Sequence, residues 1–252
     1  MRYVLKIAYD GSDYAGWQCQ KNARSVQETL EEAIKTALGK SVKTTASGRT
    51  DAGVHAAGQT CHFDLDGVSV PPEKMPDCLN RFLPPDIRVL QGWSASLAFD
   101  CNRSAKRKTY CYTLYDSLRE MPLMERYAVR VENAPSLEAL QKCAKLLEGA
   151  HDFKAFCASG SSVKTTVRTV YEVRVEETLN FGLREIKIFV TGNGFLYNMV
   201  RTMTGELLDL ASGKRTEQSL VEAFETGKRE LLGKTMPAKG LTLMCVEYGE
   251  NQ

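Results

Sequence analysis

Apolar and polar residues alternate along the first strand-like segment and then recur with helical spacing. Residues 2–9 predict a strand. A helix follows at Ser25, because the Ser25 and Glu28 side chains can each accept a backbone amide at its start. Gly39 ends that helix. The rest of the first half repeats this rhythm, with a strand over 57–65, a proline-started helix over 72–82 and a strand over 86–93.

The second half of the chain shows the same alternation. Strands are predicted over 109–115, 167–176, 184–191 and 241–248, and helices from Ser136 to Gly149, over 195–210 and over 217–226. The pair 167–176 and 184–191 has no helix between its strands, which is typical of a hairpin. The pattern therefore favours an α+β fold, with helices packed on mainly antiparallel sheets, over a doubly wound parallel sheet.

Residues 94–104 form a plausible joint between the two halves. We therefore expect an N-terminal α/β domain over 1–98 and a C-terminal α/β domain over 99–252.

Composition narrows the class of protein. The 252 residues are 43% hydrophobic and 25% charged, with a net charge of +2, which permits RNA binding without demanding it. Lys6 within the first strand argues against a signal peptide, and no apolar run reaches the roughly 18 residues of a membrane span. Eight scattered cysteines without a CxxC pair, and three histidines without metal-ligand spacing, predict reduced thiols and no metal. We expect a cytoplasmic protein.

Two glycine patterns fail as nucleotide-binding motifs. Gly11 and Gly16 have the spacing of a P-loop, but Trp-Gln follows them where Lys-Ser/Thr would hold phosphate and magnesium. Gly192 and Gly194 follow a strand, but Tyr197 replaces the third glycine of a dinucleotide fingerprint. No nucleotide cofactor is expected.

The densest basic cluster leads directly into a strand. In RSAKRKTYCYTLY (103–115), four cations precede Tyr110 and Tyr112, which share one face of the strand. Cations beside aromatic rings suit RNA, because the charges bind phosphates and a ring can stack on an unpaired base. A solvated turn before a strand with core tyrosines would give the same pattern.

Asp51 is the candidate nucleophile. In SGRTDAGVHA (47–56), it lies next to Arg49 and between Gly48 and Gly53. A neighbouring cation keeps a carboxylate ionised, and glycines allow a substrate close to the backbone. An ionised aspartate can act as nucleophile or charge stabiliser at a sugar anomeric carbon. A structural ion pair in a tight loop is the alternative.

Arg201 lies in the predicted helix FLYNMVRTMTGELLDLASGK (195–214). Phe195, Met199 and Met203 lead an apolar stripe with a spacing of four, and Arg201 is roughly opposite it. Arg201 is therefore either a surface arginine or the partner of a carboxylate in a cleft.

Together these segments resemble the tRNA pseudouridine synthases of the TruA family. SGRTDAGVHA resembles the family's signature, and the other matching segments follow in the family's order. They are YDGSDYAGWQ, the basic run into TYCYTLY, HDFKAF, TVRTV, GNGFLYNMVRTMTG and AKGLTLMCVEY. The resemblance covers essentially the whole chain.

The resemblance implies a function and a fold. The family isomerises uridine to pseudouridine at positions 38, 39 and 40 of the tRNA anticodon arm, without cofactor or metal. It implies a homodimer in which each chain has the pseudouridine synthase fold, two similar α/β domains with an active-site cleft between them. Asp51 matches the nucleophile, Tyr110 the tyrosine that stacks on the target uracil, Arg49 the arginine that displaces the base, and Arg201 the arginine that pairs with the carboxylate.

One segment departs from the family's pattern. Where Phe-His-Ala-Arg is expected, this chain has FDCN (99–102), so two candidate RNA contacts are lost and Asp100 would repel phosphate, while Arg103 restores part of the charge. Two other functions stay open on the residues alone. One is a tRNA-binding or tRNA-folding module with secondary or no catalysis, and the other is a hydrolase that releases free uracil.

Overall fold

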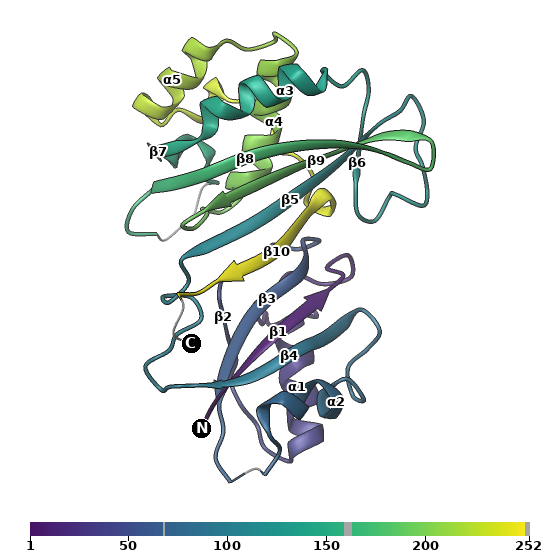
Figure 1. Ribbon diagram of the computed structural model, residues 1–252, viewed down its shortest axis with the longest axis vertical. Helices are drawn as coiled ribbons and strands as arrows, with labels where there is room; N and C mark the ends of the chain where they lie inside the picture. The colour runs from purple at the N-terminus through teal and green to yellow at the C-terminus, as the bar shows by residue number, and fades with distance from the viewer. Residues whose placement is uncertain (68, 159–162, 250–252) are drawn as a thin grey trace. The chain divides into compact units, whose positions relative to one another are not determined.

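The computed structural model describes residues 1–67, 69–158 and 163–249, and the chain divides into two compact units (Figure 1). Unit 1 comprises Met1–Lys106 and Thr242–Gln252, and unit 2 comprises Arg107–Leu241. The division thus follows Lys106 instead of residue 98, and the end of the chain returns to unit 1. Local sequence patterns do not show this return, because the last strand pairs with a segment far away in the sequence.

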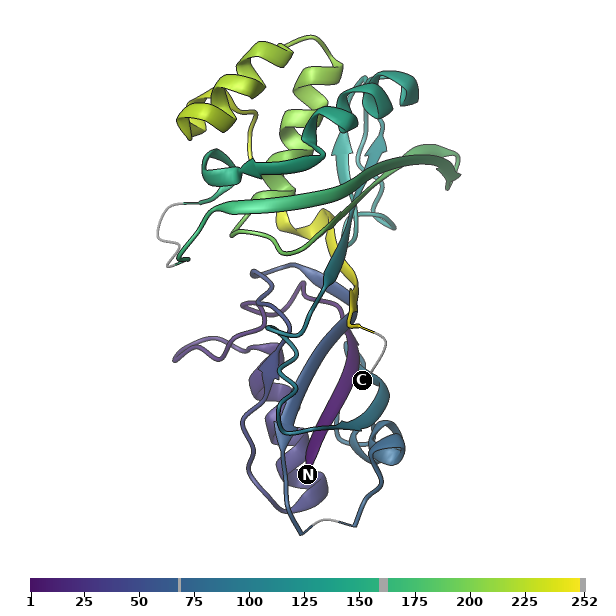
Figure 2. The same cartoon turned by 60° about the vertical axis from the view of Figure 1, so that its left-hand side comes forward.

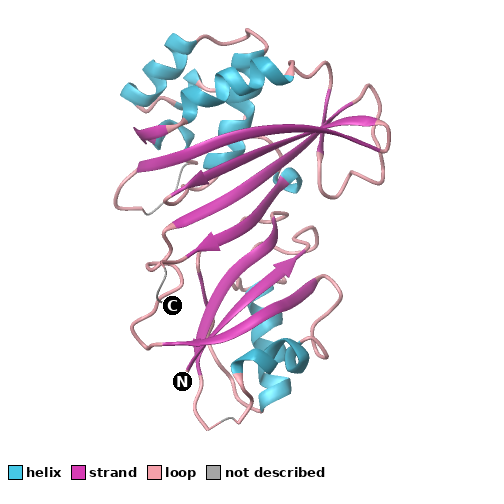
Figure 3. Cartoon of the chain, viewed as in Figure 1, coloured by secondary structure: helices cyan, strands magenta, loops and turns pink. Residues whose placement is uncertain are grey.

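Unit 1 is built on a sheet with the strand order β4-β1-β3-β10. Strand β1 is antiparallel to both β4 and β3, β10 is parallel to β3, and β2 adds to β3 (Figure 3). The bounds are β1 Arg2–Tyr9, β2 Thr45–Ala46, β3 His55–Asp64, β4 Ile87–Ala95, β10 Leu241–Glu247, α1 Val26–Leu38, α2 Met75–Leu79 and the 3-10 turn Pro72–Lys74. Fully buried Leu5, Ile7, Leu30, Ile34 and Leu79 belong to its core.

Helix α1 follows directly from its sequence signals. The Ser25 hydroxyl accepts the Glu28 amide at 3.2 Å, and Gly39 adopts the left-handed conformation (φ +69°) that ends the helix. Its buried residues are Val26, Leu30, Ala33 and Ile34, which recur at helical spacing.

Unit 2 is built on the sheet β5-β9-β8-β7, in which each neighbouring pair is antiparallel, and β6 adds to β5 in parallel. Helices α3, α4 and α5 gather on one face of this sheet (Figures 1 and 2). The bounds are β5 Arg107–Asp116, β6 Val129–Val131, β7 Gly149–Asp152, β8 Val167–Asn180, β9 Leu183–Gly192, α3 Leu137–Ala144, α4 Met199–Ala211, α5 Glu217–Thr226 and the 3-10 turns Lys145–Leu147, Phe153–Phe156, Arg229–Leu231 and Ala238–Gly240.

The fold confirms the predicted α+β class with mainly antiparallel sheets. The hairpin of β8 and β9 is present and longer than predicted. The helix predicted over 195–210 begins only at Met199, so Phe195 belongs to the preceding loop. The helix predicted over 72–82 is a 3-10 turn followed by α2, which ends at Leu79.

All eight cysteines lie in the described residues and are free thiols. Among the described helices, none combines the length and apolar character that crossing a membrane requires.

Candidate active site

Asp51 lies half-buried at the start of a turn over residues 51–54 in unit 1. The Val54 amide donates to the Asp51 carbonyl at 3.1 Å, and the Gly53 amide donates to the Tyr14 carbonyl at 3.3 Å. Gly53 has φ +78°, a left-handed conformation that glycine adopts at no steric cost. The turn is thus closed by its own hydrogen bond and tied to the loop before α1.

The loop over residues 10–17 packs against this turn, backbone to backbone. A Cβ on Gly11 would lie 2.0 Å from the Val54 carbonyl oxygen, and one on Gly16 (φ +92°) would lie 2.5 Å from that of Thr50. The Trp17 amide donates to the same Thr50 carbonyl at 3.0 Å. The two glycines that fail as a P-loop therefore have a different role, because they let this loop support the Asp51 turn.

Buried polar side chains hold the segment that leads into the turn. The Tyr9 and Thr50 hydroxyls are 2.8 Å apart, and burial raises the pKa of Tyr9 to about 12. The Ser47 hydroxyl donates to Gln59 Oε1 at 2.5 Å, while Gln59 Nε2 donates to the Gly48 carbonyl at 2.8 Å. Buried polar groups that are fully hydrogen-bonded fix one conformation. The backbone on the N-terminal side of Asp51 is therefore well defined.

His55, directly after the turn, contributes from the other side. It is buried, and its Nδ1 accepts the Gly11 amide at 3.0 Å and lies 3.2 Å from Asp10 Oδ1. The motifs YDG and GVHA thus meet in one hydrogen-bonded cluster.

Arg49 precedes Asp51 by two residues and is exposed. The described structure therefore presents a guanidinium at the surface of the same loop that holds the carboxylate, within reach of an external anion.

The segment that departs from the family's pattern forms a capped turn. Asp100 Oδ1 accepts the Asn102 and Arg103 amides, each at 2.9 Å. Burial opposes ionisation of this carboxyl, but the two amides outweigh it and lower the pKa of Asp100. Asp100 therefore has a structural role in the turn.

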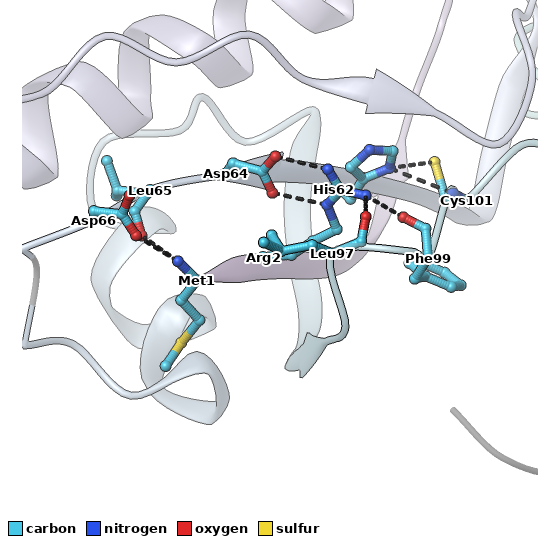
Figure 4. A network of polar contacts seen from close by, with 9 residues as sticks. All are labelled: Met1, Arg2, His62, Asp64, Leu65, Asp66, Leu97, Phe99 and Cys101. Atoms are coloured by element: carbon cyan, nitrogen blue, oxygen red, sulfur yellow. Dashed lines mark hydrogen bonds and ion pairs between the residues drawn. The ribbon is translucent and has the colours of Figure 1, made fainter.

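Arg2 holds this segment from the neighbouring strand. Its guanidinium donates to both carboxylate oxygens of Asp64, at 2.7 and 2.6 Å, and to the carbonyls of Leu97 and Phe99 (Figure 4). Cys101 is buried, with its sulfur 3.1 Å from His62 Nδ1. The small Cys101 side chain thus fills a packed position of unit 1.

Tyr110 lies on β5 in unit 2, opposite Val190 of β9. Its side chain is 8% exposed, and the Phe195 ring meets it edge-on with centroids 5.2 Å apart. Tyr112 shares its face, as predicted, and is fully buried with its hydroxyl donating to the Pro237 carbonyl at 2.6 Å. Tyr112 is therefore a core tyrosine.

The basic cluster before Tyr110 is mostly exposed. Arg103, Lys106 and Arg107 lie at the surface, and the Arg107 guanidinium stacks over the Tyr171 ring at 5.0 Å. This pair joins a cation and an aromatic face on neighbouring parts of unit 2.

Arg201 is half-buried on α4 in unit 2 and is not a freely solvated surface arginine. Its Nε donates to the Met236 carbonyl at 2.7 Å, and its Nη1 donates to Asn198 Oδ1 at 2.6 Å. The Met236 amide in turn donates to the Arg201 carbonyl at 3.2 Å. Groups of its own unit thus hold the Nε and Nη1 atoms of this side chain.

The structure thus groups Asp51 with Arg49 in unit 1, and places Tyr110 and Arg201 in unit 2. Sequence reasoning missed the supporting residues Gly11, Gly16 and Asn198. The paired glycines of the first motif were the available signal for the first two, whereas no signal pointed to Asn198. Among the described residues, no group of three or more histidine, cysteine or acidic side chains could hold a metal ion.

Comparison with known proteins covers nearly the whole chain. The family model described as tRNA pseudouridine synthase matches residues 6–102 and 143–249. Proteins named tRNA pseudouridine synthase A are 40% identical in Thermoanaerobacter sp. (strain X514), over 97% of this chain and 98% of the relative, and 42% identical in Halalkalibacterium halodurans, over 95% and 90%. The relative of that name from Acetivibrio thermocellus is 40% identical over 98% of this chain and 100% of its own length.

A solved structure titled "Crystal Structure of a Cbf5-Nop10-Gar1 Complex" aligns with 81% of this chain and 52% of its own, with 10% identity and a TM-score of 0.32, too low to support an argument. The family match includes the Asp51 turn, the loop over residues 10–17 and α4 with Arg201. On this match and these relatives, the chain belongs to the tRNA pseudouridine synthase family.

Proposed function

We propose that the protein isomerises uridine to pseudouridine in tRNA, at positions 38, 39 and 40 of the anticodon arm, with Asp51 as the nucleophile. The observation that carries this proposal is the construction of the Asp51 turn. Two close backbone contacts at Gly11 and Gly16, and hydrogen bonds of the buried Tyr9 and Gln59 side chains, hold the turn in place. Such support is what a reactive group needs in order to meet its substrate in one geometry.

The reaction suits one carboxylate. The bond between C1′ of the ribose and N1 of uracil breaks, the base turns, and a bond forms between C1′ and C5. The hydrogen on C5 leaves as a proton and N1 gains one, so nothing is oxidised or reduced. Asp51 supplies the nucleophile that carries the detached sugar or base between the two bonds. The target nucleotide must first leave the stacked helix, as for other enzymes that act on bases.

The other residues bind and orient the RNA. The Tyr110 ring stacks on the target uracil, the exposed Arg49 aids displacement of the base, and Arg201 acts with the catalytic carboxylate. The exposed cations before Tyr110 bind phosphate. The protein works without a cofactor and in the cytoplasm. It forms a homodimer, and sedimentation of the full chain would test this oligomeric state.

Tritium release from a tRNA transcript labelled at uridine C5 tests the reaction, because forming the new bond expels that hydrogen. We would compare the wild type with Asp51→Asn, which keeps the size of the side chain but not its charge. The control is Asp77→Asn, which removes a carboxylate that is 74% exposed. Wild type and the control should release tritium, and Asp51→Asn should release none above background.

The other functions predict different results. A tRNA-binding module would bind the transcript with no release from the wild type. A hydrolase would release free uracil, which chromatography separates from pseudouridine. Full activity of Asp51→Asn would remove Asp51 from the mechanism.

A further inference from the structure

Asn198 stands immediately before α4, at the N-cap position, but does not act as a cap. Its backbone is left-handed (φ +65°, ψ 1°), whereas N-cap residues are usually extended. Its carbonyl accepts the Thr202 amide at 2.9 Å, which begins the helix. Its side chain makes no capping hydrogen bond. By contrast, the side chains of Ser25, Ser136 and Thr216 cap α1, α3 and α5.

The Asn198 side chain instead bonds to Arg201. Its Oδ1 accepts Arg201 Nη1 at 2.6 Å, a short distance for a hydrogen bond from a charged donor. Departures from local rules that bring no local gain are typical of functional sites. Here the gain lies in the guanidinium that the asparagine contacts.

The second acceptor of Arg201 is rigid. Met236 O accepts Nε at 2.7 Å, and residues 233–236 are fixed to α4 at several points. The Thr202 and Thr235 hydroxyls are 3.0 Å apart. The Lys234 backbone lies close to Gly205, because a Cβ on Gly205 would be 1.9 Å from the Lys234 carbonyl oxygen. One side of the guanidinium is thus fixed by backbone, and Asn198 fixes it at a second nitrogen.

We propose that Asn198 is a positioning residue that holds the Arg201 guanidinium in its working orientation, which rests on the role given to Arg201 in the proposed function. Two anchored nitrogens stop the planar group from rotating about its last bonds. Asparagine is suited to the place because it tolerates the left-handed conformation and also carries an acceptor oxygen. Glycine would satisfy only the first requirement, and serine, threonine, glutamine or glutamate only the second.

Three variants separate these requirements. Asn198→Gly keeps the backbone conformation and removes the acceptor, and Asn198→Asp restores an acceptor. Asn133→Gly is the matched control, because Asn133 is an exposed asparagine with the same kind of backbone (φ +55°). Steady-state tritium release from the labelled tRNA transcript gives kcat and KM for each, and Arg201→Ala with and without Asn198→Gly completes a double-mutant cycle.

Asn198→Gly should lower kcat by about 10- to 100-fold, the usual effect of a lost hydrogen bond to a charged group, with little change in KM. Asn198→Asp should return to within about threefold of wild type, and Asn133→Gly should equal it. In the Arg201→Ala background Asn198→Gly should have almost no effect. Any one of three results would overturn the proposal. The first is a wild-type kcat in Asn198→Gly, and the second is a loss of kcat in Asn198→Asp as large as that in Asn198→Gly. The third is an effect of Asn198→Gly that stays as large in the Arg201→Ala background.

Hydrogen exchange of the Arg201 Nη1–H that Asn198 accepts, followed by NMR, decides the same question without relying on activity. The exchange should be at least tenfold faster in Asn198→Gly than in wild type or Asn133→Gly, and an unchanged rate would overturn the proposal. An inactive wild type would refute the proposed function and leave this measurement still able to test the role of Asn198.

Discussion

Replacing Gly16 with alanine should disturb the Asp51 turn from a distance of 35 positions in the sequence. The new Cβ would lie 2.5 Å from the Thr50 carbonyl oxygen, 3.0 Å from the Asp51 carbonyl carbon and 3.1 Å from the Ala52 nitrogen. These are backbone atoms, which cannot rotate away as a flexible side chain would. Ordinary contact begins at 3.4 Å, so the two loops must separate by about 0.9 Å at the closest point.

Two costs add at this position. An L-residue in a left-handed conformation costs about 1–2 kcal/mol, and overpacking costs about 1–3 kcal/mol more. We therefore expect Gly16→Ala to lower the free energy of unfolding by about 2–5 kcal/mol. A displacement of a catalytic group by about 1 Å costs about 100-fold in rate, so kcat of the folded variant should fall by about that factor.

Gly39→Ala is the matched control for this experiment. Gly39 is also left-handed (φ +69°), but a Cβ there meets nothing within 4 Å, so the variant loses only about 1–2 kcal/mol and keeps its kcat. Urea unfolding gives the free energies, and tritium release corrected for the folded fraction gives kcat. Wild-type kcat in folded Gly16→Ala would refute the view that this contact positions Asp51.

Two further predictions concern unit 2. If stacking is the main role of Tyr110, Tyr110→Phe should bind tRNA nearly as tightly as wild type in a filter-binding assay. Tyr110→Ala should lose about 1–3 kcal/mol of tRNA-binding free energy. A large loss of turnover in Tyr110→Phe alone would instead indicate proton transfer by the hydroxyl. Glu206 is fully buried, and burial raises its pKa above the ordinary 4.5. As the pH rises, the unfolded chain therefore loses this proton before the folded chain does. The free energy of unfolding should then fall between pH 4.5 and the raised pKa. Denaturation across that pH range should show a shallower fall of the free energy of unfolding in Glu206→Gln than in wild type. The exposed control Glu222→Gln should show the wild-type fall. Equal slopes in wild type and both variants would contradict this assignment.

Local signals were sufficient for much of the fold. Ser25 and Gly39 mark both ends of α1 because capping hydrogen bonds and left-handed glycine act within a few residues. The helix over 217–226 was predicted with its observed bounds. The predicted start of α4 was wrong, because Phe195 fits the spacing of the apolar stripe although it lies in the loop before the helix and contacts Tyr110. Spacing alone cannot separate a helical residue from an apolar loop residue just before the helix.

The candidate site shows the same limit. Asp51 and Arg49 could be selected from one decapeptide, because charge and glycine content are local properties. The groups that support them, such as Tyr9, Gln59 and Gly16, come from other segments and meet only in the folded chain. Arg201 could not be assigned from its pattern, since its orientation depends on the carbonyl of Met236, 35 residues away.

The return of the chain end to unit 1 also concerns the order in which the protein is made. Strand β10 pairs with β3 at His55 and Ala56, the residues that follow the Asp51 turn, yet it is synthesised only after unit 2. Until then β3 lacks this neighbour, and an unpaired strand edge can associate with other chains. Unit 2 is encoded entirely between the two parts of unit 1 and can be complete first. The domain that holds the proposed nucleophile is thus begun before unit 2 and finished after it during synthesis.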